Sequence, residues 1–236
     1  MKDAILFDLD GTLLPTDNDS FTKAYFKLLA KAAYEWGYQD SELLMKSVMA
    51  GVAAMVENDG KVTNHDVFWG CFEKIMGRDC KKDIPDFDKF YMTDFHKAKE
   101  ICKPAPLAKA VVNAARKKAE KVILATNPLF PPEGVKARLS WIGLEADDFD
   151  FITDYTNSCY CKPNPMYYKM IMDKFGIRGE NAVMVGNDFE EDIKASEAAG
   201  ISRSFLITDH VIMRSEGEIG CPSGNYQAML EFLENL

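Results

Sequence analysis

Five short apolar runs, each bounded by turn residues, stand out along the chain. They cover residues 3–9, 121–126, 149–153, 182–186 and 203–207. Runs of this kind, without polar alternation, are typical of strands buried on both faces of a sheet. Helical patterns separate the later runs, at 131–142 and 163–175, and in the first of them Val135, Leu139 and Ile142 share one face. The alternation of strand and helix predicts an α/β fold with a doubly wound parallel sheet.

Residues 15 to about 100 contain hardly any strand-like run and have a helical pattern instead. The apolar residues that recur at the helical period are Phe21, Tyr25, Leu28, Leu29 and Ala32, followed by Leu44, Val48 and Val52. Proline-containing segments at 14–17 and 102–106 flank this region and would act as hinges. We therefore expect an all-helical insert after the first strand. We expect its aromatic residues, including Tyr25, Trp36 and Trp69, to form the core of the helical bundle.

Polar residues follow each of the first four predicted strands. In chain order they are Asp8 and Asp10, then Thr126 and Asn127, then Lys162, and finally Asn187, Asp188, Glu191 and Asp192. In an open parallel sheet, ligands gather at the carboxyl ends of the strands. Side chains from four separate segments are therefore predicted to form a single site.

The chemistry of this set of side chains points to phosphoryl transfer. Several carboxylates brought together repel one another unless a cation lies among them, and oxygen ligands suit Mg²⁺. Mg²⁺ usually shares its coordination with substrate phosphate, while a lysine and a threonine hydroxyl suit phosphoryl oxygens. An aspartate can act as a nucleophile, and a second carboxyl nearby can donate and accept protons. Asp8 and Asp10, one residue apart, match these two roles.

Composition narrows the class of protein. The 236 residues are 47% hydrophobic and 28% charged, as in a soluble globular protein. A net charge of −9 without a basic run argues against nucleic acid and anionic membranes as partners. No signal peptide or membrane span is recognisable, so we expect a cytoplasmic protein. The six cysteines are expected to be free thiols, since a CxC at Cys159 and Cys161 lacks the further ligands of a zinc site.

Four segments in order resemble the signature motifs of the haloacid dehalogenase-like (HAD) superfamily. They are "DLDGT" after the first strand, Thr126 after the second, Lys162 before a proline and "GNDFEED" after the fourth. The resemblance covers residues 1–14 and about 100–210, and the helical insert matches the helical cap that this superfamily places after its first motif. It implies a Rossmann-like HAD core at 1–14 and 100–236 with a smaller all-helical cap domain at 15–99.

The resemblance also implies roles for individual residues. Asp8 would be the nucleophile and a metal ligand, while Asp10 would be the general acid and base and would bind Mg²⁺ through its backbone carbonyl. Thr126, with Asn127 beside it, would bind phosphoryl oxygens, and Lys162 would neutralise Asp8 and the transferring group. Backbone amides at 9–11 would donate to the developing charge. The second aspartate indicates phosphate chemistry, because members that act on carbon–halogen bonds generally lack it.

The fourth motif departs from the pattern of many relatives, in which aspartate follows the glycine directly. Here Asn187 occupies that position and Asp188 follows. Either Asp188 makes the direct metal contact, or Asn187 binds through its amide oxygen with one charge fewer. We favour Asp188, with Asn187, Glu191 and Asp192 behind it, where Asp192 would orient Lys162 or a metal-bound water.

The sequence thus predicts a Mg²⁺-dependent phosphatase that hydrolyses a small-molecule phosphomonoester through a phospho-aspartate intermediate. One alternative is a phosphomutase of the same superfamily. Another is a non-catalytic metabolite-binding protein on the same fold, although Asp8 and Asp10 together would serve no purpose there. The expected partner is a small phosphorylated metabolite, and the sequence leaves the oligomeric state open. Specificity is expected to depend on residues 15–100, where Asp17, Asn18, Asp19 and Lys23 could face the substrate.

Overall fold

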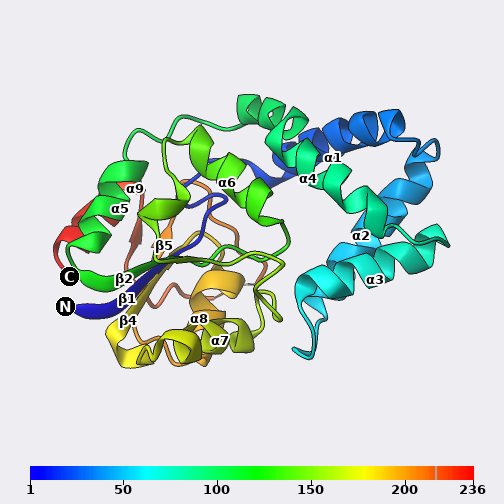
Figure 1. Cartoon of the computed structure of the whole chain (residues 1–236). Coiled ribbons are helices and arrows are strands. Elements are labelled where there is room, and N and C mark those ends of the chain that lie inside the picture. The colour runs from blue at the N-terminus through cyan, green and yellow to red at the C-terminus, as the bar shows by residue number, and fades with distance from the viewer. Residues whose placement is uncertain (216) are drawn as a thin grey trace.

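A sheet of six parallel strands organises the computed structural model, which describes residues 1–215 and 217–236. The strands are β1 (Lys2–Phe7), β2 (Ala119–Leu124), β3 (Phe151–Ile152), β4 (Ala182–Gly186), β5 (Ser204–Ile207) and β6 (Ser223–Gly224). Their order is β3-β2-β1-β4-β5-β6 (Figure 1). Strands β2 and β3 extend the sheet on one side of β1, and β4, β5 and β6 extend it on the other. The predicted doubly wound parallel sheet is therefore confirmed.

The central strand explains why the apolar runs show no alternation. In β1, Ile5 and Phe7 pack into a core cluster on one face, while Ala4 and Leu6 pack into a second cluster on the other. All four side chains are fully buried. Successive side chains of a strand point to opposite faces, so a sheet covered on both sides needs apolar residues at every position.

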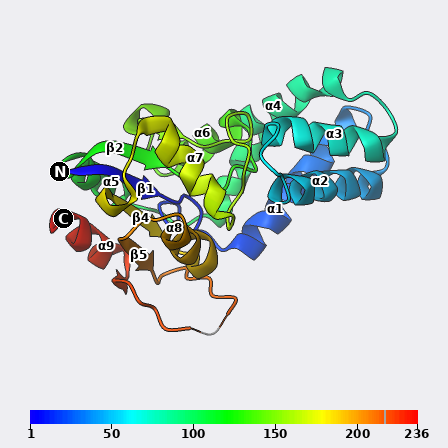
Figure 2. The same ribbon diagram turned by 90° about the horizontal axis from the view of Figure 1, so that it is seen from below.

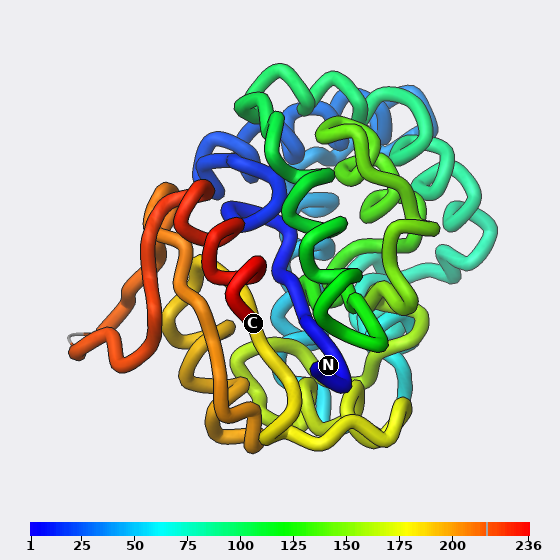
Figure 3. The backbone as a smooth tube through the Cα atoms, turned by 90° about the vertical axis from the view of Figure 1, so that its left-hand side faces the viewer, coloured from blue at the N-terminus to red at the C-terminus, as the bar shows by residue number. Residues whose placement is uncertain are grey.

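Helices cover both faces of the sheet. The helices of the core are α5 (Ala108–Arg116), α6 (Pro132–Trp141), α7 (Pro165–Phe175), α8 (Ala195–Ala198) and α9 (Tyr226–Glu234). Helices α5 and α9 pack side by side on one face, and α7 and α8 lie together on the other (Figures 1 and 3). Short 3₁₀ helices occupy Ala146–Asp148 and Gly179–Asn181, and a π-helix at Phe189–Lys194 leads directly into α8.

A separate group of helices follows β1, away from the sheet (Figure 2). These helices are α1 (Asn18–Glu35), α2 (Ser41–Val56), α3 (Asn64–Met76) and α4 (Ile84–Met92), with 3₁₀ segments at Lys81–Asp83 and Asp94–Ile101. Side chains cap three of them: Asp17, Asp40 and Thr63 accept backbone N–H groups in the first turns of α1, α2 and α3. The region contains no strand between residues 18 and 101, as its helical pattern predicts.

Two strands differ from the sequence expectation, whereas the free cysteines agree with it. Strand β6 was not predicted, because two residues without an apolar run carry no recognisable strand pattern. The third strand is only two residues long within the predicted 149–153. All six cysteines are free thiols. Among the described residues, no helix has the length and apolar character needed to span a bilayer.

Candidate active site

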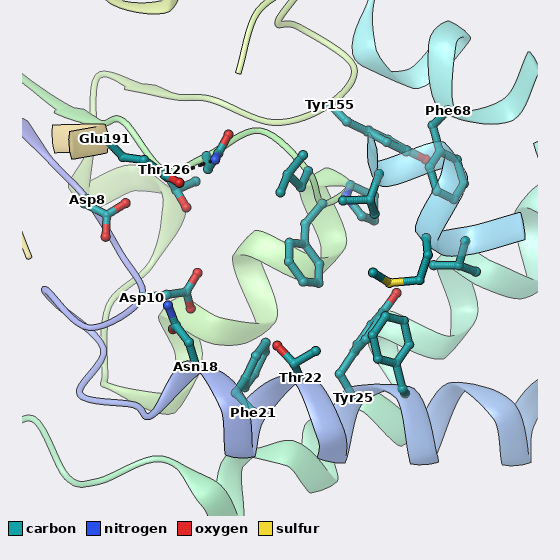
Figure 4. A pocket seen from close by; sticks show the side chains of 18 of the residues that line it. Asp8, Asp10, Asn18, Phe21, Thr22, Tyr25, Phe68, Thr126, Tyr155 and Glu191 are labelled. Atoms are coloured by element: carbon teal, nitrogen blue, oxygen red, sulfur yellow. Dashed lines mark hydrogen bonds between the residues drawn. The ribbon is translucent and has the colours of Figure 1, made fainter. Parts of the chain in front are cut away.

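The polar residues predicted at the strand ends meet in one cavity of about 360 Å³. It lies between the carboxyl ends of the strands and the helices α1–α4 (Figure 4). The predicted site residues that line it are Asp8, Asp10, Thr126, Asn127, Asn187, Asp188, Glu191 and Asp192. Lys162 lies behind this lining and contacts two of its carboxylates. The convergence of the four segments is therefore confirmed.

Lys162 is the buried cation of the site. It is 1% exposed, and its Nζ donates to Asp8 Oδ1 at 2.9 Å and to Asp192 Oδ1 at 2.6 Å. Burial disfavours the charged form, but the Asp192 and Asp8 carboxylates outweigh burial and raise the pKa of Lys162 well above its usual value. The ammonium group therefore stays charged between the two carboxylates.

Asp192 contacts the Lys162 ammonium and is itself held by backbone hydrogen bonds. Its Oδ2 accepts hydrogen bonds from the backbone N–H groups of Asn187 and Asp188, both at 3.0 Å. This carboxylate packs so closely on the end of β4 that a Cβ atom at Gly186 would lie 2.2 Å from Asp192 Oδ2. Burial raises the pKa of Asp192, and the Lys162 ammonium opposes that rise. Asp192 thus contacts Lys162 directly, in the place that its predicted orienting role requires.

Asp10 pairs with an arginine that the sequence analysis missed. Nη1 of Arg138, on α6, donates to Asp10 Oδ2. The guanidinium carbon also lies 4.2 Å from the Phe130 ring centroid, and the side chain is 1% exposed. Arg138 falls on the same helical face as Val135 and Ile142, so a charged residue within an apolar stripe was the signal that could have revealed it.

The surroundings of Asp10 favour its protonated form. Asp10 Oδ1 is buried and has no hydrogen-bond partner among the described residues. Burial raises the pKa of Asp10 above its usual value, the Arg138 charge opposes this, and the Asp8 charge adds to it. A carboxyl with a raised pKa is better suited to general acid chemistry than an ordinary one.

Backbone and amide contacts hold the second and third strand ends together. The Thr126 carbonyl accepts a hydrogen bond from the Tyr167 hydroxyl at 2.8 Å, and the threonine is buried in the same cavity lining as Asp8. Asn127 Oδ1 accepts from the Lys162 backbone N–H at 3.3 Å, and Asn127 Nδ2 donates to Glu191 Oε2 at 3.1 Å. Asn127 therefore links the loop of Lys162 to the fourth segment.

The two residues that compete for the predicted metal contact have different partners. Asn187 Oδ1 accepts the Thr12 hydroxyl at 3.1 Å, and its Nδ2 donates to the His210 carbonyl at 2.7 Å. Asp188 Oδ2 lies 2.7 Å from Arg214 Nη1. Arg214 was missed because it lies in a loop far beyond the fourth motif, where the sequence shows no pattern. Asn187 thus has both amide atoms engaged with neutral partners, whereas Asp188 contacts the cationic Arg214 and also accepts two backbone N–H groups through Oδ1.

The donor set suits a hard divalent ion. Within 1–215 and 217–236, no three histidine, cysteine, aspartate or glutamate side chains are arranged to hold a metal ion by themselves. The predicted set needs fewer, because Asp10 would contribute its backbone carbonyl and Mg²⁺ often binds through one or two carboxylates plus substrate and water. Asp8 and Asp188 both line the cavity and would supply the carboxylate oxygens. The residues present therefore fit Mg²⁺.

The helical segment contributes more to the cavity than the sequence suggested. Tyr25 and Trp69 line it as well as packing in the bundle, so assigning them to the bundle core alone was incomplete. Trp36 packs against Phe87, as expected of a core residue. Of the polar residues near the hinge, Asn18 lines the cavity, whereas the Asp17 side chain caps α1.

Comparison with known proteins points to one family. The chain is 26% identical to phosphoglycolate phosphatase of Aquifex aeolicus (strain VF5), over 90% of this chain and 88% of that protein. It is 23% identical to a phosphorylated carbohydrates phosphatase of Thermotoga maritima, over 86% of this chain and 84% of that protein. The crystal structure of 2-haloacid dehalogenase from Pseudomonas syringae pv. Tomato DC3000 shares the fold, with a TM-score of 0.60, 18% identity, and coverage of 99% and 98%.

The model of the haloacid dehalogenase-like hydrolases matches residues 2–200, a span that includes all four predicted motifs and the helical insert. The chain therefore belongs to the haloacid dehalogenase-like hydrolase family.

Proposed function

We propose that this protein is a Mg²⁺-dependent phosphatase that hydrolyses a small phosphomonoester through a phospho-Asp8 intermediate. The single observation that carries the proposal is the arrangement at the end of β1. There Asp8 is held by a buried Lys162, while Asp10, with its raised pKa, lines the same cavity two residues further on. The names of the curated relatives, which are phosphatases of small phosphorylated compounds, support the same class of substrate.

In the first step, an Asp8 carboxylate oxygen attacks the phosphorus atom. A bond forms between that oxygen and phosphorus as the bond from phosphorus to the alcohol oxygen breaks. Protonated Asp10 gives its proton to the departing oxygen, so the product leaves as a neutral alcohol. The Lys162 ammonium, 2.9 Å from Asp8, offsets the negative charge brought in by the phosphoryl group.

In the second step, water releases the phosphate. Asp10, now a carboxylate, takes a proton from a water molecule whose oxygen attacks phosphorus. The bond between phosphorus and Asp8 breaks, which restores the Asp8 carboxylate and leaves Asp10 protonated for the next cycle. Both aspartates therefore end the cycle as they began it.

Mg²⁺ would be held by Asp8, Asp188 and the Asp10 backbone carbonyl, and it would neutralise charge on the phosphoryl oxygens. The Thr126 hydroxyl, with Asn127 beside it, would bind phosphoryl oxygens. Asn187, Glu191 and Asp192 would orient these groups from behind. We propose that residues 15–99 act as a cap over a core formed by 1–14 and 100–236. A cytoplasmic location remains a prediction from the sequence.

Hydrolysis is favoured over the phosphomutase alternative by the charges around the cavity. A mutase has to bind a substrate with a second phosphate, which requires cations on the side of the leaving group. Among the described residues of α1–α4 that line the cavity, none is lysine, arginine or histidine. This lining supports transfer of the phosphoryl group to water.

The test is phosphate release from a panel of phosphomonoesters, with Mg²⁺ and with the metal removed by a chelator. Asp8→Asn and Asp10→Asn are compared with Asp147→Asn, which changes an exposed aspartate on a 3₁₀ segment outside the cavity. We expect metal-dependent release by the wild type and by Asp147→Asn. Release should fall by at least about a thousandfold in Asp8→Asn. Undiminished release by folded Asp8→Asn would overturn the proposal.

A further inference from the structure

The cavity extends well beyond Asp8 and Asp10. Its volume of about 360 Å³ reaches between the core and the inner sides of α1–α4 (Figure 4). This is the size of cavity that encloses a small molecule. A phosphoryl group bound at Asp8 occupies one end, so the remaining space surrounds the alcohol part of the substrate. The inference below therefore rests on the proposed function.

The wall around this space is mostly aromatic and aliphatic, with Asn18 and Thr22 as polar side chains at its edge on α1. Figure 4 shows Phe21 and Tyr25 on α1 and, across the cavity, Phe68 and Tyr155. Val52 from α2 adds an aliphatic side chain. The Tyr25 hydroxyl is hydrogen-bonded to the Tyr91 hydroxyl at 2.8 Å, so these two hydroxyls are partnered without a ligand. Such a wall gains free energy when it contacts apolar surface removed from water.

The charges of the lining exclude a second anion on the substrate. Among the described residues of α1–α4, Asp88 is the only one in the lining with a formal charge. Among the described residues of the whole lining, Arg214 is the one cation, and it already contacts Asp188 and Glu191 from the fourth segment. A carboxylate or second phosphate on the alcohol would lose its hydration opposite aromatic rings, with no cation in compensation.

We propose that the substrate is the phosphate ester of a predominantly apolar, uncharged alcohol, with no second phosphate or carboxylate. The phosphoryl group lies at Asp8, and the alcohol part lies against Phe21, Phe68 and Tyr155. This separates the protein from a phosphatase for a metabolite that carries a second anionic group. In such a phosphatase the leaving group would need cations in the cap, and none of the described lining residues of α1–α4 is lysine, arginine or histidine.

A homologous series of n-alkyl phosphates, from methyl to octyl, tests this directly. Leaving-group basicity changes little along the series, so changes in kcat/KM report contacts with the alcohol part. We expect kcat/KM to rise about fourfold per added methylene until the cavity is filled. The ω-carboxylated analogue of hexyl phosphate should react at least about a hundredfold more slowly than hexyl phosphate itself.

Two aromatic-to-alanine variants distinguish an effect of the cavity wall on chain-length preference from an effect of losing any aromatic side chain of the helices. Phe68→Ala removes a buried ring that lines the cavity, whereas Tyr34→Ala removes a ring that is 59% exposed on α1 and lines no part of it. Phe68→Ala should lower the ratio of kcat/KM for hexyl over methyl phosphate by at least about tenfold. Tyr34→Ala should leave that ratio unchanged. Calorimetry with hexylphosphonate, which cannot be hydrolysed, measures the same contacts without catalysis.

The outcomes distinguish this inference from the function on which it rests. Turnover of methyl phosphate with a flat chain-length profile, or with a preference for the carboxylated ester, would overturn the inference and leave the phosphatase proposal standing. Absence of any metal-dependent turnover would overturn the phosphatase proposal. In that case, hexylphosphonate binding no tighter than methylphosphonate would overturn the apolar site as well.

Discussion

Nζ of Lys162 lies 2.6 Å from Asp192 Oδ1, and both side chains are only 1% exposed. The same ammonium group lies 2.9 Å from Asp8 Oδ1. One buried charge therefore connects the end of β1 with the segment after β4, through two carboxylates that would otherwise repel each other. Under the proposed mechanism Asp192 would act as a positioning residue, because it contacts the cation that also contacts the proposed nucleophile Asp8.

Asp192→Asn should lower both stability and activity. Removing one partner of a buried ion pair leaves the other charge poorly compensated, which costs about 3–5 kcal/mol. The free energy of unfolding, measured by urea denaturation, should fall by about that amount. The value of kcat should fall on the order of tenfold to a hundredfold, because Lys162 loses one of the two groups that hold it near Asp8.

An exposed ion pair serves as the control for that variant. Asp59 and Lys61 form a surface pair whose side chains are 59% and 82% exposed. Asp59→Asn should leave the free energy of unfolding nearly unchanged and kcat unchanged, because solvent screens an exposed ion pair. Equal effects of Asp59→Asn and Asp192→Asn would contradict the role assigned to the buried pair.

Gly11→Ala should impair catalysis beyond its effect on stability. Gly11 has a φ of +83°, and a Cβ atom there would lie 2.3 Å from Asn187 Nδ2. The variant combines left-handed strain of about 1–2 kcal/mol with a collision that would move the turn after Asp10 away from the fourth segment. We expect kcat to fall at least about tenfold, measured with the best ester of the panel.

Gly143→Ala is the control that introduces the backbone strain without the collision with a neighbouring side chain. Gly143 has a φ of +71°, but a Cβ atom there would meet nothing within 4 Å. This variant should show a similar loss of stability and normal kcat. Equal kcat in the two alanine variants would mean that the contact between Gly11 and Asn187 does not matter for the site.

Arg138→Gln should move the pH dependence of activity in a defined direction. Burial raises the pKa of Asp10, and the Arg138 charge opposes that rise. The proposed first step needs protonated Asp10, so kcat should fall as the pH rises through its pKa. Without the Arg138 charge this pKa is higher still, and the alkaline limb of the pH profile should shift to higher pH. A purely structural role would scale the profile without moving that limb.

The sequence could reveal the sheet and the polar strand ends because both depend on local patterns. The run at 182–186 has no charged residue and is buried at every position in β4, and Asp8 and Asp10 follow β1 directly in the chain. Arg138 and Arg214 escaped prediction because their importance arises from contacts across 128 and 26 residues of chain, with Asp10 and Asp188. Only the folded chain places them there.

The cavity wall could not be predicted for a related physical reason. An aromatic residue on the apolar face of a helix has the same spacing whether it meets another helix or an open space. Phe72 packs within the bundle, whereas Phe68, one turn earlier, also lines the cavity. The relative placement of α1, α3 and the loop containing Tyr155 decides which residues can meet a substrate.

Asp3→Asn should reduce stability in a manner that depends on pH. The Arg178 side chain and backbone N–H hydrogen-bond to Asp3 and lower its pKa from 3.8 to about 2. A carboxyl with a lowered folded-state pKa stabilises the fold above its unfolded-state pKa, and this contribution is lost as the pH falls toward 2. The variant should therefore have a lower Tm than the wild type at pH 6. This difference in Tm should shrink as the pH falls from about 4 to 2. A difference that is constant with pH would contradict this linkage.

The most direct test of the central claim is to look for the phosphoryl group on Asp8. The wild-type protein with Mg²⁺ is mixed with the best ester of the panel, quenched in acid within a single turnover, digested, and analysed by mass spectrometry. A phospho-Asp8 intermediate should give one added phosphoryl group on the peptide that contains Asp8, and none in Asp8→Asn. Turnover without any phosphorylated peptide, together with an active Asp8→Asn protein, would contradict it.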